Sequence, residues 1–237
     1  LIGRDEELAQ LDACFRRIEG NLAQVVAIVG EAGSGKSRLL YEFRQRLDSR
    51  PVTFFEGRCS SLTQAIPYAP FTAMLRQHFG IKPGDARDAT VEKIARGLQV
   101  FDGGLDHALP YLRHLLGVPG DDLPELAADE LKQATFEAVA HLVLAESRRT
   151  PVVMVVEDLH WVDDASREML EMAASNLATS RVMKIVSHRP DFRPEPVDLT
   201  AATARALSTR TDVLQARKNL EANDVTLRYL ENQKLPL

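Results

Sequence analysis

The chain has 237 residues, of which 45% are hydrophobic and 27% charged, which is ordinary for a globular protein and excludes global disorder and fibrous repeats. Its formal net charge of -5 provides no broad positive field for a phosphate backbone, so we expect no direct nucleic-acid contact. Two widely spaced cysteines and the lack of any stretch of roughly 18 apolar residues predict a reduced, cytoplasmic protein that does not contact a membrane.

The first part of the chain alternates between helix and strand patterns. Apolar side chains at helical spacing predict an amphipathic helix over Asp5–Glu19. The short apolar run at residues 23–29 predicts a central parallel strand, because it is too short for a buried helix. Helical spacing resumes at residues 37–47, and residues 52–55 predict a second strand.

After a loop predicted at residues 60–70, the sequence becomes mostly helical. Clusters such as KPGD, DGG and VPGDD separate four predicted helices, which cover residues 71–79, 90–101, 108–116 and 129–148. Two more strands are predicted at residues 152–156 and 182–186, with a helix at 165–177 between them. This alternation predicts an α/β protein with a parallel sheet, helices on both of its faces, and a helical insertion at about residues 67–149.

The run GEAGSGKS follows the first predicted strand and fits the phosphate-binding pattern GxxxxGK[ST]. Glycines let the backbone curl so that successive amides face one anion, and the next helix adds its positive end. A glycine-rich turn without a ligand is the alternative, but the preceding strand and following helix favour the phosphate site. The pattern predicts a P-loop NTPase that binds ATP and magnesium, with Lys36 at the β- and γ-phosphates and Ser37 as a magnesium ligand. The expected nucleotide-binding residues are Gly30, Glu31, Ala32, Gly33, Ser34, Gly35, Lys36, Ser37 and Arg38.

The third predicted strand ends in two carboxylates, within VVMVVEDLHWVDDAS, which is the layout of a Walker B segment. A strand beside the P-loop strand can carry an acidic residue to magnesium. We expect Glu157 to hold the metal through water and Asp158 to polarise the attacking water, although the reverse assignment stays open. The alternative for such residues is a helix N-terminus, where the macrodipole favours acidic side chains; it suits Asp163 and Asp164 better.

Four segments resemble the ATPase domain of STAND proteins, a branch of AAA+-like proteins found in bacterial nucleotide cyclases and LuxR-type transcriptional regulators. They are LIGRDEELAQL, GEAGSGKSRLL, DLHWVDDAS and VSHRPDF, within residues 1–193. The resemblance implies a slow ATPase that acts as a nucleotide-dependent switch, whose bound ATP or ADP controls other domains of a longer parent protein and its self-association. It further implies that Gly3 and Arg4 lie by the adenine and that Arg189, or His188 as the weaker candidate, senses the γ-phosphate.

The end of the chain departs from this family. The segment RTDVLQARKNLE followed by QKLP resembles a helix of trimeric outer-membrane efflux channels, and Val213, Leu220 and Leu227 repeat every seven residues. We therefore expect an ATPase domain at residues 1–196 and a long helical tail at 197–237. An ordinary terminal helix of the ATPase domain is the alternative.

Two other functions stay open besides the switch. A P-loop kinase would use the same Lys36 and Ser37 but needs an acceptor pocket and a basic lid. The tail alone would suit a fragment of an efflux-channel component. His160 and Trp161 belong to the signature DLHW, but we interpret them as packing residues, because an indole after a buried strand more often packs than reacts.

Overall fold

The computed structural model describes residues 4–101, 104–176 and 180–192, which belong to one compact unit, Leu1–Pro194. The long helix predicted for residues 197–237 lies outside the described residues, as does the boundary predicted at residue 196. Both stay predictions.

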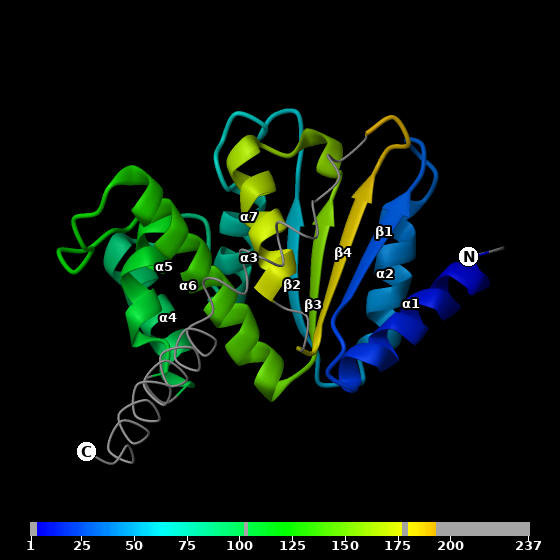
Figure 1. Cartoon of the computed structure of the whole chain (residues 1–237), viewed down its shortest axis with the longest axis horizontal. Helices are drawn as coiled ribbons and strands as arrows, with labels where there is room; N and C mark the ends of the chain where they lie inside the picture. Colours follow the sequence, from blue (N-terminus) through cyan, green and yellow to red (C-terminus); the bar gives the residue numbers. More distant parts are fainter. Residues whose placement is uncertain (1–3, 102–103, 177–179, 193–237) are drawn as a thin grey trace, which may run out of the picture. The chain divides into compact units, whose positions relative to one another are not determined.

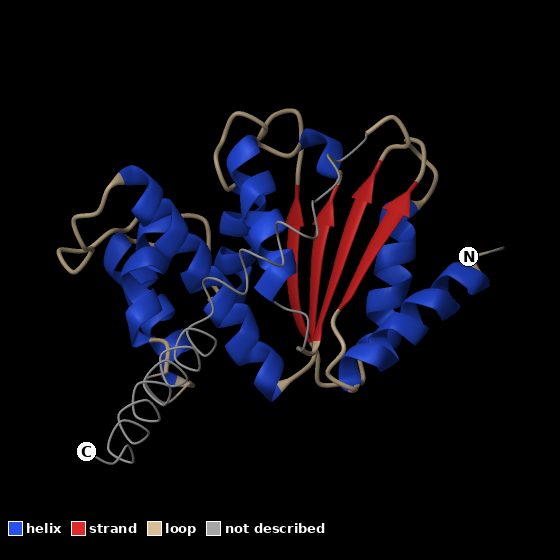
Figure 2. Cartoon of the chain, in the orientation of Figure 1, coloured by secondary structure: helices blue, strands red, loops and turns tan. Residues whose placement is uncertain are grey.

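Four parallel strands form the central sheet in the order β1-β4-β3-β2 (Figure 1, Figure 2). The strands are β1 (Gln24–Val29), β2 (Thr53–Arg58), β3 (Val152–Glu157) and β4 (Val182–His188). Helices connect them, which confirms the predicted α/β class with a parallel sheet.

One detail of the predicted sheet is wrong: the acidic strand β3 does not lie beside the P-loop strand β1, because β4 lies between them. The burial of the strands explains this order. Residues of β3 and β4 are buried almost without interruption, as interior parallel strands require, whereas β1 alternates between half-buried and exposed residues and forms an edge of the described sheet.

Alternate side chains of β3 belong to two separate hydrophobic cores, one on each face of the sheet. The helices that flank the sheet are α1 (Asp5–Glu19), α2 (Lys36–Leu47), α3 (Ala69–His78), α6 (Ala128–Arg149) and α7 (Asp164–Asn176). Val153 and Val155 pack with α1 and α2, while Met154 and Val156 pack with α3, α6 and α7 on the opposite face. Helices therefore cover both faces, as predicted (Figure 1).

The predicted helical insertion lies between β2 and β3, before the acidic strand. It contains α3, α4 (Arg87–Gln99), the short 3-10 helix η1 (Asp106–Ala108), α5 (Leu109–Leu115) and α6. Its side chains share one core with the sheet, because Ile94 and Leu112 belong to the same buried cluster as Met154.

Strand β2 ends three residues later than predicted. The sequence indicates a strand only to Phe55, but Glu56, Gly57 and Arg58 continue the parallel pairing and lie opposite residues 155–157 of β3. The extension carries β2 to the same edge of the sheet where β3 ends.

Candidate functional site

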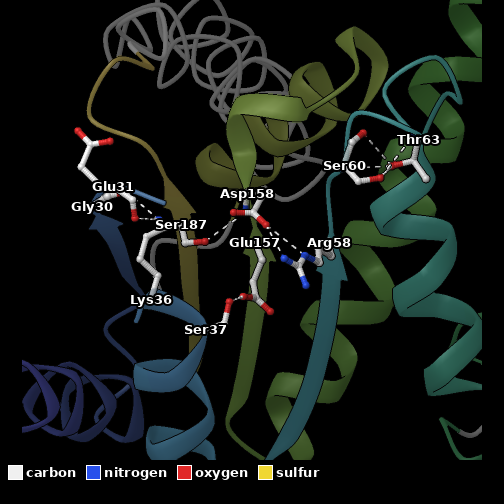
Figure 3. A network of polar contacts seen from close by, with 10 residues as sticks. All are labelled: Gly30, Glu31, Lys36, Ser37, Arg58, Ser60, Thr63, Glu157, Asp158 and Ser187. Atoms are coloured by element: carbon white, nitrogen blue, oxygen red, sulfur yellow. Dashed lines mark hydrogen bonds and ion pairs between the residues drawn. The ribbon is translucent and has the colours of Figure 1, made fainter. Parts of the chain in front are cut away.

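The carboxyl ends of the parallel strands bring the predicted site residues together at one edge of the sheet. Val29 lies opposite His188 across the β1–β4 pair, and Arg58 lies opposite Glu157 across the β2–β3 pair. The P-loop begins directly after Val29. Figure 3 shows that the P-loop and the two acidic residues face a common space at this edge.

The backbone of the P-loop needs its glycines. Gly33 and Gly35 have φ angles of 77° and 85°, a region that other residues rarely adopt. A side chain on Gly30 would lie 2.5 Å from Ser34 Oγ, so the loop closes against itself there. Lys36 Nζ folds back over the loop and donates hydrogen bonds to the carbonyl oxygens of Gly30 (2.7 Å) and Glu31 (2.9 Å).

Helix α2 begins at Lys36, so Ser37 lies in its first turn and faces the acidic strand. Ser37 Oγ donates a hydrogen bond to Glu157 Oε2 at 2.5 Å (Figure 3). The two residues are 120 positions apart in sequence, so this contact depends on the sheet topology. It places a hydroxyl and a carboxylate oxygen at one point.

Asp158 is held in an unusual backbone conformation between β3 and the short 3-10 helix η2 (Leu159–Trp161). Its φ of 55° and ψ of 45° are left-handed, a conformation that costs a non-glycine residue free energy. Its backbone N–H donates to Ser187 Oγ of β4 at 3.1 Å, and Ser187 is 1% exposed. Neighbouring strands therefore fix the backbone of Asp158.

The structure adds Arg58, a residue that our sequence interpretation missed. Its Nε and Nη2 lie 3.1 Å and 3.0 Å from Asp158 Oδ2 (Figure 3). The sequence signal that could have found it is the period-two alternation beyond Phe55: Phe54 and Glu56 are half-buried and Arg58 is exposed, while Phe55 and Gly57 are buried on the other face.

A pocket of about 350 Å³ joins these groups. It is lined by residues 32–38 together with Arg58, Asp158 and Arg189. Backbone amides of a loop, a lysine and three arginines are groups that attract an anion such as a phosphate. Of the two acidic residues, Asp158 lines the pocket and Glu157 contacts Ser37 of its lining; a cation there would offset their charge.

Residues 1–186 match the family model of the AAA ATPase domain. The chain belongs to the AAA ATPase domain family. It is also 28% identical, over 229 residues, to an uncharacterized protein of Rhizobium meliloti (strain 1021). The match covers 87% of this chain and 20% of that protein, so the chain spans about one fifth of the length of its relative.

Of the other predicted residues, Arg189 lines the pocket and Arg4 contacts its P-loop. Arg4 donates from Nη2 to the carbonyl oxygen of Ser34 at 2.5 Å and from Nη1 to Glu7 at 3.0 Å, so it contacts the P-loop directly. Gly3 lies outside the described residues. Of the two candidates at the end of β4, Arg189 lines the pocket, whereas His188 is 8% exposed and its ring lies edge-on against Phe192.

Asp163 and Trp161 of the DLHWVDDAS signature support the strand end structurally. Asp163 Oδ1 accepts hydrogen bonds from the backbone N–H groups of Ser166 (2.8 Å) and Tyr68 (3.2 Å), so it acts at the start of α7 and ties the loop after β2 to it. Trp161 packs against the buried cluster around β3, as interpreted from the sequence. Burial, and then the nearby charge of Arg189, lower the pKa of His160.

Residues 4–101, 104–176 and 180–192 contain no group of three or more His, Cys, Asp or Glu side chains placed to hold a metal ion. None of the helices in those ranges is long and apolar enough to cross a membrane.

Proposed function

We propose that this AAA ATPase domain binds ATP with magnesium at residues 30–38, hydrolyses it slowly, and acts as a nucleotide-dependent switch in signalling or transcription regulation. The observation that carries the proposal is the contact between Ser37 and Glu157, 2.5 Å across the sheet edge. It joins the two halves of an ATPase site, the phosphate loop and the acidic strand end.

The donor set fits magnesium. Hydroxyl and carboxylate oxygens are the hard ligands that this ion takes, and magnesium uses one or two carboxylates with substrate phosphates rather than a complete protein cage. Ser37 would bind the ion directly and Glu157 through water. The ion would neutralise charge on the β- and γ-phosphates.

The other side chains of the site would have separate roles in nucleotide binding and hydrolysis. Lys36, which lies over the loop, would bind the β- and γ-phosphates. Asp158 would orient the attacking water, because its backbone is fixed at the strand end by Ser187. Arg189 lines the pocket and would sense the γ-phosphate through its planar fork of donors. Arg4 would hold the loop, and with Gly3 it would lie by the adenine.

The proposed switch role rests on the resemblance to STAND proteins and on the length of the relative from Rhizobium meliloti. The relative from Rhizobium meliloti is about five times longer than its matched part, which suits a domain that controls others in a longer parent protein. We propose such domains, and further copies of this one, as partners that respond to bound ATP or ADP.

The proposal is tested with the purified chain in a phosphate-release assay and by calorimetry with ATP and ADP, with and without magnesium. Lys36→Ala serves as the matched loss-of-function variant. Magnesium-dependent ATP binding with slow phosphate release supports the proposal. Rapid transfer of the γ-phosphate to an added acceptor, without release of free phosphate, would instead identify a kinase.

We also propose that residues 197–237 are separable from the ATPase domain at residues 1–196. Every described residue assigned to the site lies before residue 190. A chain cut after Pro196 should bind ATP with unchanged affinity. Loss of binding in this truncated chain would make the tail part of the domain.

A further inference from the structure

Arg58 occupies a position that the proposed ATPase chemistry leaves without a role. It ends β2, an edge strand of the described sheet, and its side chain is 66% exposed at the pocket that the P-loop and Arg189 also line. Within the described part of the chain, Asp158 is the one partner of its guanidinium. Two of its nitrogens contact a single oxygen, Asp158 Oδ2.

The end of β2 holds Arg58 in place. The preceding Gly57 has no room for a side chain, because an added Cβ would lie 2.6 Å from the carbonyl oxygen of Pro70 in α3. On the other side, the backbone N–H of Cys59 donates to the carbonyl oxygen of Glu157 at 2.9 Å. Arg58 therefore starts from a fixed backbone and reaches across the end of β3.

We propose that Arg58 is a phosphate-contacting residue that couples the terminal phosphate of ATP to Asp158. A guanidinium has five N–H donors in a planar fork, so it can hold Asp158 with one edge and present its remaining donors to a phosphate. Such a bridge positions the carboxylate beside the γ-phosphate, where the attacking water must lie. The proposal rests on the proposed ATPase function and adds a residue to it.

Arg44 of α2 also lies near the end of β2, but it is about two helix turns beyond Lys36. Arg44 also forms an ion pair on this face of the sheet, with Glu56 of β2, and stacks over Phe54 at 4.8 Å. It does not line the pocket with the P-loop among the described residues, whereas Arg58 does. A phosphate in that pocket would therefore meet Arg58.

The test compares Arg58→Gln, Arg58→Lys and the control Arg46→Gln in the full chain. Arg46 forms a similar arginine–aspartate pair, with Asp12 at 2.9 Å, but away from the pocket. Calorimetry should show ATP affinity reduced by about fivefold or more in Arg58→Gln, because a charge-assisted contact is lost. ADP affinity should stay within about twofold, since ADP lacks the γ-phosphate. Arg58→Lys should recover part of the ATP affinity, and Arg46→Gln should match the unmodified chain.

A double-mutant cycle then tests the coupling to Asp158. The rate of single-turnover hydrolysis should fall in Arg58→Gln and in Asp158→Asn. The double variant should be little slower than Asp158→Asn alone, because both changes disrupt the same Arg58–Asp158 pair. Additive losses would overturn the coupling. Equal loss of ATP and ADP affinity in Arg58→Gln would overturn the phosphate contact. If the unmodified chain binds ADP and ATP but Arg58→Gln behaves like Arg46→Gln, the ATPase proposal stands and the Arg58 proposal fails.

Discussion

Replacing Lys184 with methionine should change how stability depends on pH. Lys184 lies in the middle of β4, 5% exposed, and its Nζ donates to the carbonyl oxygen of Leu170 in α7 at 2.9 Å. Burial lowers the pKa of Lys184 from 10.5 to about 8, because the ammonium loses its water in the core. Methionine has a similar unbranched shape and carries no charge.

The magnitude follows from the two pKa values. The difference between 10.5 and about 8 is about 2.5 units, which corresponds to about 3 kcal/mol at about 1.4 kcal/mol per unit. The folded pKa lies below the unfolded one, so the unfolded chain binds more protons between pH 8 and pH 10.5. Stability therefore rises with pH across this window: the cost of the buried charge is fully present below pH 8 and is lost toward pH 10.5.

Denaturant unfolding of both chains at about pH 7 and about pH 10 measures this effect. The stability advantage of Lys184→Met over the unmodified chain should shrink by about 2 kcal/mol between the two conditions, while other titrating groups cancel in the difference. Lys82→Met, at an exposed position, is the control and should show little change. If Lys184→Met and the unmodified chain differ in their free energy of unfolding by the same amount at both pH values, the reasoning is refuted.

The remaining predictions concern the nucleotide site. Lys36→Ala leaves the backbone amides of the loop in place but removes their neighbouring cation, so ATP affinity by calorimetry should fall at least about tenfold, or about 1.4 kcal/mol; unchanged affinity would contradict the phosphate site. Ser37→Ala should act through magnesium, so its binding defect should shrink in EDTA, and an equal defect in both conditions would exclude a metal role. Asp158→Asn should keep ATP binding while phosphate release falls about tenfold or more; the same phenotype in Glu157→Gln instead would reverse the two roles. Arg189→Ala should weaken ATP more than ADP, and equal weakening would make Arg189 a structural residue.

The sequence predicts those parts of the fold that depend on the pattern of neighbouring residues along the chain. Continuous apolar runs mark β3 and β4, and the glycine spacing before Lys36 marks the turn into α2. The predicted bounds of these elements agree with the structure to within a few residues. The convergence of the P-loop with Glu157 also follows, because parallel strands end at one edge.

Strand order and the end of β2 depend on contacts that no local pattern contains. The place of β4 between β1 and β3 follows from burial on both faces, which depends on the helices that pack there. The extension to Arg58 contains Glu56 and Gly57, which are poor strand formers, and pairing with β3 carries it. Arg58 was missed for this reason, since its neighbour Asp158 is 100 residues away.

The left-handed backbone at Asp158 lowers the stability of the fold, whereas the proposed hydrolysis needs the aspartate side chain at this position. Glycine adopts that conformation without strain, so Asp158→Gly should remove a local cost of about 1 kcal/mol, less the greater freedom of glycine in the unfolded chain. Such a variant would keep its sheet and lose the carboxylate that the proposed hydrolysis uses. A library selected for heat resistance alone would therefore drift toward glycine or asparagine at this position, and its survivors would be well-folded domains that bind nucleotide without turning it over.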